Sequence, residues 1–173
     1  RNANKEKIFL DLRAGAESGW DFSSRWFRDP NDIRTIHTAD IVPVDLNALL
    51  YHLEKTISKA YRLSKKPNAA RRYELRAERR VEAIMKYCWD DELVCFVDYD
   101  LTTERHTGIK SLAMIFPLYV GIATAEQAAH VAKVKRYESG VLRDPVVITS
   151  QTTVRQVMQL SDELGVSGFP VVD

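Results

Sequence analysis

The chain has 173 residues, of which 45% are hydrophobic and 28% are charged, so its composition is that of a globular protein of about one domain. Its 25 Lys and Arg residues and 24 Asp and Glu residues leave a net charge of +1, which predicts no attraction to nucleic acid or to an anionic membrane surface. The longest apolar run, residues 112–123, is too short to span a bilayer, and the two cysteines fit no zinc or redox spacing, so the sequence predicts no membrane partner, no metal and no cofactor.

The N-terminal part of the chain predicts irregular structure. Residues 8–27 (IFLDLRAGAESGWDFSSRWF) show neither the period of a strand nor that of a helix. Four aromatic residues fall within eight positions of this segment: Trp20, Phe22, Trp26 and Phe27. We expect a wall or loop that faces a cavity rather than a surface helix, followed by a turn at residues 28–32 (RDPND).

Residues 45–64 (DLNALLYHLEKTISKAYRLS) contain the clearest helical pattern. Apolar residues recur there every three or four positions: Leu46, Leu49, Leu50, Leu53, Ile57 and Tyr61. Residues 65–68 (KKPN) end this helix, and a second helix is predicted over residues 69–87, which gives a helix hairpin. Residues 62–80 carry eight Lys or Arg residues against two Glu residues, and we interpret them as a solvated helix face with a polar turn, with an RNA- or phosphate-binding patch as the alternative.

Shorter elements are predicted after the hairpin. Residues 89–101 (WDDELVCFVDYDL) predict a turn followed by one short strand. Residues 111–122 predict an apolar helix that is kinked at its proline. Residues 124–137 predict a further helix, because Thr124 and Gln127 have the spacing of a capping box.

The pattern changes after Gly140. Strands rich in β-branched residues are predicted at residues 146–149 and 169–172, and they flank a helix predicted over residues 154–164. A β-α-β unit that follows an almost wholly helical region suggests that two architectures are joined in this chain.

Five sequence blocks stand in the order and at the approximate spacing found in one enzyme family: RAGAESGWDFSSRWF (residues 13–27), IVPVDLNALL (41–50), WDDE (89–92), DYD (98–100) and FPLYVGIAT (116–124). Over about residues 1–130 the chain therefore resembles trehalase, the glycoside hydrolase that splits α,α-trehalose into glucose. The resemblance implies a mainly α fold that forms part of an (α/α)6 toroid, in which helix hairpins surround a funnel with the sugar site at one mouth.

The resemblance also implies an inverting mechanism that needs two carboxyl groups. One protonates the leaving glycosidic oxygen, and the other, about 6.5–9.5 Å away, activates water on the opposite face of the sugar. Asp21, in the SGWD motif, matches the family's catalytic general acid, while Gly19 and Trp20 match substrate-binding positions, as close backbone and as an aromatic wall. From the residues alone, Asp21 fits a helix-cap or turn carboxylate as well.

The general base of the family has no counterpart in this sequence. Neither the QWDxPxGWxP-type signature near that base nor the arginine-bearing PGGRFxExYxWDxY-type segment is matched. Four further carboxylates are interpreted as structural hydrogen-bonding groups: Glu17, Asp45, Glu92 and Asp98. We therefore expect a glycosidase fragment that does not hydrolyse trehalose alone, since losing an acid–base partner costs about 10²–10⁴-fold in rate.

Residues 133–173 resemble a different family. ESG (residues 138–140), DP (144–145) and SGFPVVD (167–173) match inosine-monophosphate dehydrogenase at the point where paired cystathionine-β-synthase (CBS) modules interrupt its barrel. This second resemblance implies a small β-α-β CBS-like half-module, and it carries over no nicotinamide or nucleotide site.

Together, the two resemblances predict a chimera, with a trehalase-like helical fragment at residues 1–130 and a dehydrogenase/CBS-like fragment at residues 131–173, joined within residues 126–135. The partner of a glycosidase fragment would be a small sugar, trehalose or glucose. Two alternatives stay open: a CBS-type regulatory module that binds nucleotides, and a non-functional helical protein that self-associates through unpaired apolar faces. No targeting segment is recognisable, so cytoplasmic, periplasmic and extracellular locations all stay open.

Overall fold

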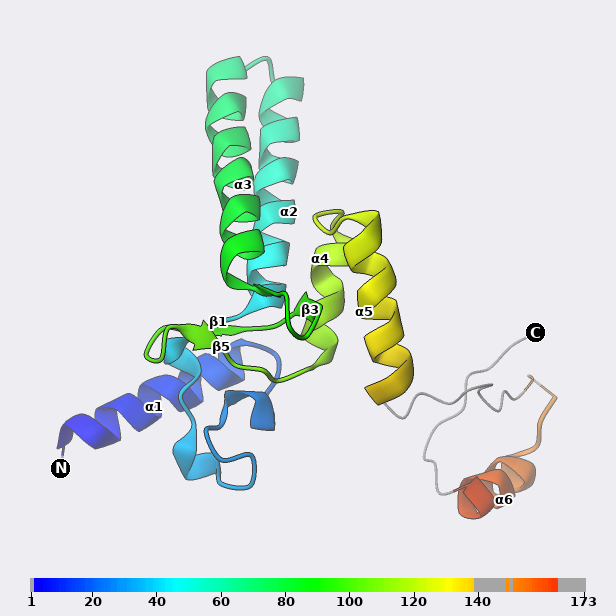
Figure 1. The fold of residues 1–173 in the computed structure, drawn as a ribbon. Coiled ribbons are helices and arrows are strands. Elements are labelled where there is room, and N and C mark those ends of the chain that lie inside the picture. Colours follow the sequence, from blue (N-terminus) through cyan, green and yellow to red (C-terminus); the bar gives the residue numbers. More distant parts are fainter. Residues whose placement is uncertain (1, 139–148, 150, 165–173) are drawn as a thin grey trace. The chain divides into compact units, whose positions relative to one another are not determined.

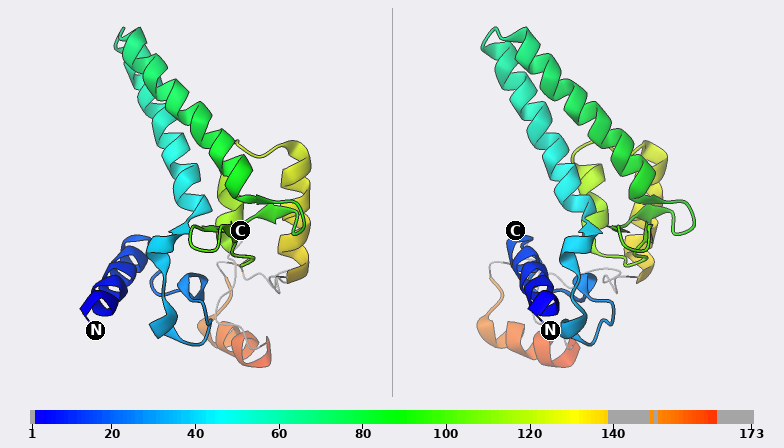
Figure 2. Two further views of the ribbon diagram at one scale, coloured as in Figure 1. Left: turned by 60° about the vertical axis from the view of Figure 1, so that its left-hand side comes forward. Right: turned by 90° about the vertical axis from the view of Figure 1, so that its left-hand side faces the viewer.

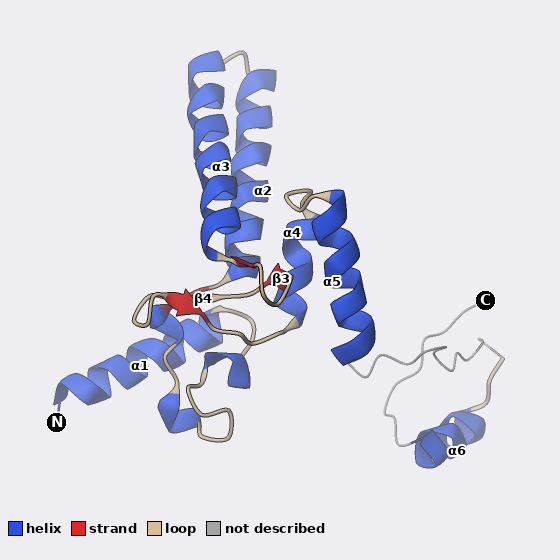
Figure 3. Cartoon of the chain, viewed as in Figure 1, coloured by secondary structure: helices blue, strands red, loops and turns tan. Residues whose placement is uncertain are grey.

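The structure is a computed structural model that describes residues 2–138, 149 and 151–164, and most of these residues are helical (Figures 1 and 3). The mainly α fold predicted from the sequence is therefore confirmed. The chain separates into two compact units, Arg1–Val131 and Ala132–Asp173.

The first unit begins with a helix, α1 (Asn2–Glu17), so the prediction of irregular structure was wrong for the first half of residues 8–27. The hydrophobic pattern gave no signal because the buried positions of α1 include Asp11 and Gly15. Phe9, an apolar residue of the same helix, is 68% exposed. A helix that buries a carboxylate and a glycine has no apolar stripe from which it could be predicted.

Asp11 joins α1 to the segment that follows it. Its carboxylate accepts a hydrogen bond from the backbone N–H of Ala39 at 2.8 Å. The Lys7 ammonium group, one helical turn earlier, lies 3.1 Å from Asp11 and 2.9 Å from Asp40. These contacts hold α1 against a short 3-10 helix, η3 (Thr38–Asp40).

Short elements connect α1 to the next long helix. They are two further 3-10 helices and a two-residue strand: η1 (Ser24–Trp26), η2 (Ile33–Thr35) and β1 (Ile41–Val42). The predicted turn at residues 28–32 is confirmed, because the Asn31 N–H donates a hydrogen bond to the Asp29 side chain at 3.0 Å. Apolar side chains of this segment form a small core: Trp26, Phe27, Ile36 and Ile41, with Leu12 and Trp20 packed against them.

The predicted helix hairpin is confirmed. Its arms, α2 (Val44–Leu63) and α3 (Pro67–Tyr87), lie side by side (Figures 1 and 2). The apolar row that predicts α2 is only half buried, since Leu46, Leu49 and Leu53 are 50%, 45% and 51% exposed. The buried positions of the two helices include four small residues: Ala48, Ser58, Ala70 and Ala77.

Ion pairs also link the two arms of the hairpin. The Arg80 guanidinium donates two hydrogen bonds, each of 2.9 Å, to the buried carboxylate of Glu54. Near the tip, Glu74 pairs with Lys55 and Arg62. The Arg62 side chain is mostly exposed, which agrees with the predicted solvated face.

The residues after the hairpin form two small antiparallel sheets, one of them together with β1, where one turn and one short strand were predicted for residues 89–101. The strands are β2 (Trp89–Asp90), β3 (Cys95–Phe96), β4 (Tyr99–Asp100) and β5 (Arg105–His106). β2 pairs with β3, while β4 lies between β1 and β5, with Val42 and His106 both opposite Tyr99. This arrangement brings Asp98 and Asp100 next to the segment that precedes α2.

A short helical segment replaces the kinked helix predicted at residues 111–122. A 3-10 helix, η4 (Leu112–Ile115), continues directly into α4 (Phe116–Tyr119). Pro117 stands in the first turn of α4, where its missing N–H leaves no hydrogen bond unmade. Among the described helices, none is both long and apolar enough to cross a membrane.

α5 (Ala125–Glu138) begins with the predicted capping box. The backbone N–H of Gln127 donates to the Thr124 hydroxyl at 3.1 Å, and the Thr124 N–H donates to the Gln127 side chain at 3.0 Å. Both ends of the reciprocal motif are therefore present, as the spacing of the two residues predicts.

In the second unit, α6 (Val154–Leu164) has the bounds that the sequence predicts. The strand predicted at residues 169–172 lies outside the described residues, and so does all of the strand predicted at 146–149 except Thr149. The CBS-like half-module and the boundary between residues 130 and 131 therefore stay predictions.

Candidate active site

The loop that carries the predicted acid begins at the end of α1 and is fixed by hydrogen bonds on both sides of Asp21. The Ser18 hydroxyl donates to the Gly15 carbonyl at 2.6 Å and accepts the Trp20 N–H at 3.0 Å. The Trp20 carbonyl then accepts the Ser23 N–H at 2.7 Å and the indole N–H of Trp26 at 3.0 Å. The backbone is therefore held immediately before and after the acid position.

Gly19 has a backbone reason to be glycine. Its φ angle is +76°, in the left-handed region that side chains disfavour, and open space lies where a Cβ atom would stand. The backbone conformation of this turn is therefore enough to explain why residue 19 is a glycine. That a sugar approaches the backbone of Gly19 stays a prediction.

Asp21 lies exposed at the tip of this loop, and the peptide bond that joins it to Phe22 is cis. Its carboxylate accepts no hydrogen bond from the described residues. The turn carboxylate of Asp32 differs, because it accepts the backbone N–H of Arg34 at 2.9 Å. A partner-free carboxyl group at the end of a fixed loop is available to a ligand.

A buried arginine holds the base of the loop. Arg25 is 1% exposed, and its guanidinium donates two hydrogen bonds to Asp45 (2.8 and 3.0 Å) and two to Asp98 (2.6 and 2.7 Å). The guanidinium carbon also lies 4.9 Å from the Trp20 ring centroid and 4.4 Å from that of Trp26. We call Arg25, Asp45 and Asp98, with these two tryptophans, the arginine clamp.

The clamp reaches α2 as well. The Asp98 carboxylate accepts the backbone N–H of Val44, the first residue of α2, at 2.9 Å, while Asp45 is the second residue of the same helix. Carboxylates at a helix N-terminus are favoured by its unpaired N–H groups. Burial lowers the pKa of Arg25, but the hydrogen bonds and charges of Asp98 and Asp45 outweigh burial, so the pKa is raised and the group stays charged.

The clamp should make the stability of the chain depend on pH in the acidic range. Burial alone would raise the pKa of Asp45, but hydrogen bonds and charge from Arg25 outweigh it, so the pKa lies below its ordinary value of 3.8. A carboxyl group whose pKa is lower in the folded than in the unfolded chain stabilises the fold at pH values above its unfolded pKa. This stabilisation is lost as the pH falls through its folded pKa. Below about pH 4, we expect the urea concentration at the midpoint of unfolding to decrease as the pH is lowered. In Asp45→Asn this midpoint should decrease less steeply with pH. Equal slopes of midpoint against pH for both proteins would contradict this.

A cavity of about 440 Å³ lies beside the clamp, and Trp20 and Asp45 are among its lining residues. Much of the rest is apolar, with Leu46, Leu49 and Phe116 on the wall. Of the three predicted site residues, only the tryptophan lines this cavity, whereas Gly19 and Asp21 lie exposed on the adjoining loop. The structure does not bring all three together around this cavity.

The role of Arg25 is not predicted by the sequence patterns. The interpretation of Asp45 and Asp98 as structural hydrogen-bonding groups is confirmed, and Glu17 forms a surface ion pair with Arg13 at 2.8 Å. The available signal was an arginine beside Trp26 in the SSRW stretch, since a charge among apolar residues needs a buried partner. No group of three or more His, Cys, Asp or Glu residues within the described part of the chain could hold a metal ion.

Comparison with known proteins gives one consistent result. The family model described as trehalase matches residues 1–156. The chain is 44% identical over 131 residues to the periplasmic trehalase of Citrobacter koseri and 47% identical over 126 residues to that of Pseudomonas aeruginosa, covering 76% and 73% of this chain but 23% of each relative. The neutral trehalase of Saccharomyces cerevisiae has a similar structure, with a TM-score of 0.65 at 28% identity over 77% of this chain and 24% of the yeast chain.

Proposed function

The chain belongs to the trehalase family, and we propose that its first unit supplies the acid side of a site that hydrolyses α,α-trehalose to glucose with inversion. Asp21 is the general acid in this proposal, and Trp20 and Gly19 face the sugar. The observation that carries it is the exposed Asp21 carboxyl group, which accepts no hydrogen bond from the described residues, on a loop fixed by the arginine clamp. The chain spans about a quarter of the length of the curated relatives it matches.

We propose further that the 173-residue chain alone does not turn over trehalose. An inverting glycosidase needs a second carboxylate that is free to activate water. Asp45 and Asp98, the carboxylates that hold the base of the loop, are both occupied by the Arg25 guanidinium, so neither is free to act as that base. In this proposal the water-activating group comes from other residues of a complete trehalase.

A hybrid enzyme tests this proposal. The matching 126 residues of the Pseudomonas aeruginosa trehalase are replaced by those of this chain, at 47% identity, and glucose release from trehalose is measured. We expect activity in the hybrid and none in the isolated chain. A well-folded but inactive hybrid would contradict the proposed role, and glucose release by the isolated chain would contradict its dependence on an external base.

For residues 131–173 we propose the CBS-like half-module, supported by the second resemblance and by the position of α6. The trehalase match, which extends to residue 156, counts against a junction of two families within residues 126–135. A nucleotide site would be complete only in a dimer that joins two half-modules, and such a dimer predicts heat on titrating the chain with ATP, ADP or AMP in a calorimeter. No heat with any of the three nucleotides would exclude it.

A further inference from the structure

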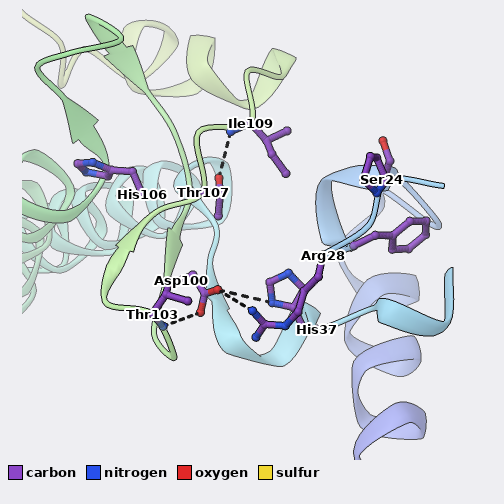
Figure 4. A pocket seen from close by; sticks show the side chains of 10 residues that line it. Ser24, Arg28, His37, Asp100, Thr103, His106, Thr107 and Ile109 are labelled. Carbon is purple, nitrogen blue, oxygen red and sulfur yellow. Dashed lines mark hydrogen bonds and ion pairs between the residues drawn. The ribbon is translucent and has the colours of Figure 1, made fainter. Parts of the chain in front are cut away.

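A second cavity, of about 420 Å³, shares no lining residue with the cavity beside Trp20. Its walls come from η1 and the turn after it, from His37, and from β4, β5 and the residues next to them. Figure 4 shows the side chains of Arg28, His37 and Asp100 gathered together, with Ser24 of η1 apart from them. Neither Asp21 nor any residue of the arginine clamp lines this pocket.

Arg28 is positioned and still has donors to offer. Its guanidinium donates to the Asp100 carboxylate at 3.4 Å and to the Thr102 hydroxyl at 3.0 Å. Asp100 is itself fixed, because it accepts the backbone N–H groups of Thr102 and Thr103 at 2.7 and 3.3 Å. A guanidinium has five N–H donors, and the Arg28 side chain is 46% exposed, so further donors are free for a ligand.

His37, which lines the pocket, has a ring nitrogen without a hydrogen-bond partner among the described residues. The residue is 7% exposed, and its Nδ1 has no hydrogen-bond partner within the described residues. The nearest carboxylate oxygen, on Asp100, is 4.0 Å away, which is too long for a hydrogen bond. Buried polar atoms are nearly always bonded, so the unpaired Nδ1, which is itself buried, makes His37 an unusual polar residue behind the pocket wall.

The charges around the pocket favour an uncharged ligand. Burial and the charge of Arg28 lower the pKa of His37, so the ring is neutral near pH 7 and offers one donor and one acceptor nitrogen. Asp100 and Asp40 lie 3.4 and 3.7 Å from the Arg28 guanidinium and offset its charge toward any anion. Ser24, among the hydroxyl residues of the wall, both donates and accepts.

We propose that this pocket binds one ring of a neutral sugar, as a carbohydrate site separate from Asp21. Arg28 contacts hydroxyl groups of the ring, Ser24 and Thr103 add hydroxyl contacts, and Phe27 offers an apolar face to its C–H groups, with His37 on the pocket wall. A sugar matches the pocket because each of its hydroxyls donates and accepts, while the C–H faces of the ring are apolar. The proposal does not depend on Asp21 acting as an acid.

Titration of the 173-residue chain with glucose, followed by two-dimensional NMR, tests the proposal. We expect saturable shifts in the millimolar range at residues of the pocket. The double variant Ser24→Ala/Thr103→Val should bind glucose about tenfold more weakly. Both side chains are exposed and make no side-chain hydrogen bond within the described residues, so the variant should fold.

Two matched variants make the outcome decisive. Thr56→Val removes an exposed hydroxyl on α2, outside the pocket, and should bind glucose as the parent chain does. Asp21→Asn changes the acid loop and reports any glucose that binds there instead. The proposal is overturned if glucose binding does not saturate, if the double variant binds it unchanged, or if inorganic phosphate binds in its place. Binding lost only in Asp21→Asn would overturn it too, while supporting the function proposed for the acid loop.

Discussion

In the hybrid trehalase, replacing Asp21 by asparagine is expected to lower kcat for trehalose by about 10²–10⁴-fold. An amide has nearly the size of a carboxyl group but cannot give up the proton that the departing glucose oxygen needs. Because the Asp21 carboxylate has no hydrogen-bond partner within the described residues, the substitution breaks no contact that shapes the loop. Glucose release at saturating trehalose measures the effect.

A substrate with a better leaving group separates acid catalysis from a structural role of Asp21. Fluoride departs without being protonated, so the Asp21→Asn hybrid should lose far less activity on an α-glucosyl fluoride than on trehalose. Glu92→Gln, a change at another exposed carboxylate, should leave both rates unchanged. Equal losses on the two substrates in Asp21→Asn would show that this residue is not the acid.

Replacing Arg25 by methionine is expected to destabilise the chain by about 3–5 kcal/mol, because it leaves the buried Asp45 and Asp98 carboxylates without a counter-charge. A typical domain is stable by only about 5–15 kcal/mol, so the loss should be large enough to unfold part of the population. The free energy of unfolding in urea, measured on the 173-residue chain, reports the effect.

Two further arginine variants define what the clamp requires. Arg25→Lys keeps the charge but lacks the planar fork that serves two carboxylates, so it should recover only part of the stability. Arg13→Met removes an ion pair whose arginine is 75% exposed, and it should leave the urea midpoint unchanged. If Arg25→Met unfolds at the same urea concentration as Arg13→Met, the clamp does not stabilise the fold.

The elements that the sequence predicts correctly are those whose signal is local. The periodicity of residues 45–64 predicts α2, and the spacing of Thr124 and Gln127 predicts the start of α5, because each pattern acts within a few turns of helix. α1 escapes such reasoning, since its buried Asp11 is satisfied by the backbone of Ala39 in another element.

The residues of the candidate site likewise differ in whether a short stretch of sequence predicts them. Asp21 is found through a motif that resembles a family, and its exposure gives no contact by which it could be recognised otherwise. Arg25 lies 73 positions from Asp98 in the chain, and no periodicity or short motif connects residues so far apart. Leu46 and Leu49 show the opposite limit, since both are half-buried. Helical spacing predicts the apolar face to which they belong but not which residues cover that face.

Asp98 takes part in two interactions at once, because its one carboxylate accepts hydrogen bonds from the Arg25 guanidinium and from the first backbone N–H of α2. Any substitution there removes a counter-ion and a helix cap in a single step, so its measured cost cannot be apportioned between the two. Only a double-mutant cycle with Arg25 isolates the ionic share. Anchoring the acid loop and starting the hairpin are thus thermodynamically coupled at this residue.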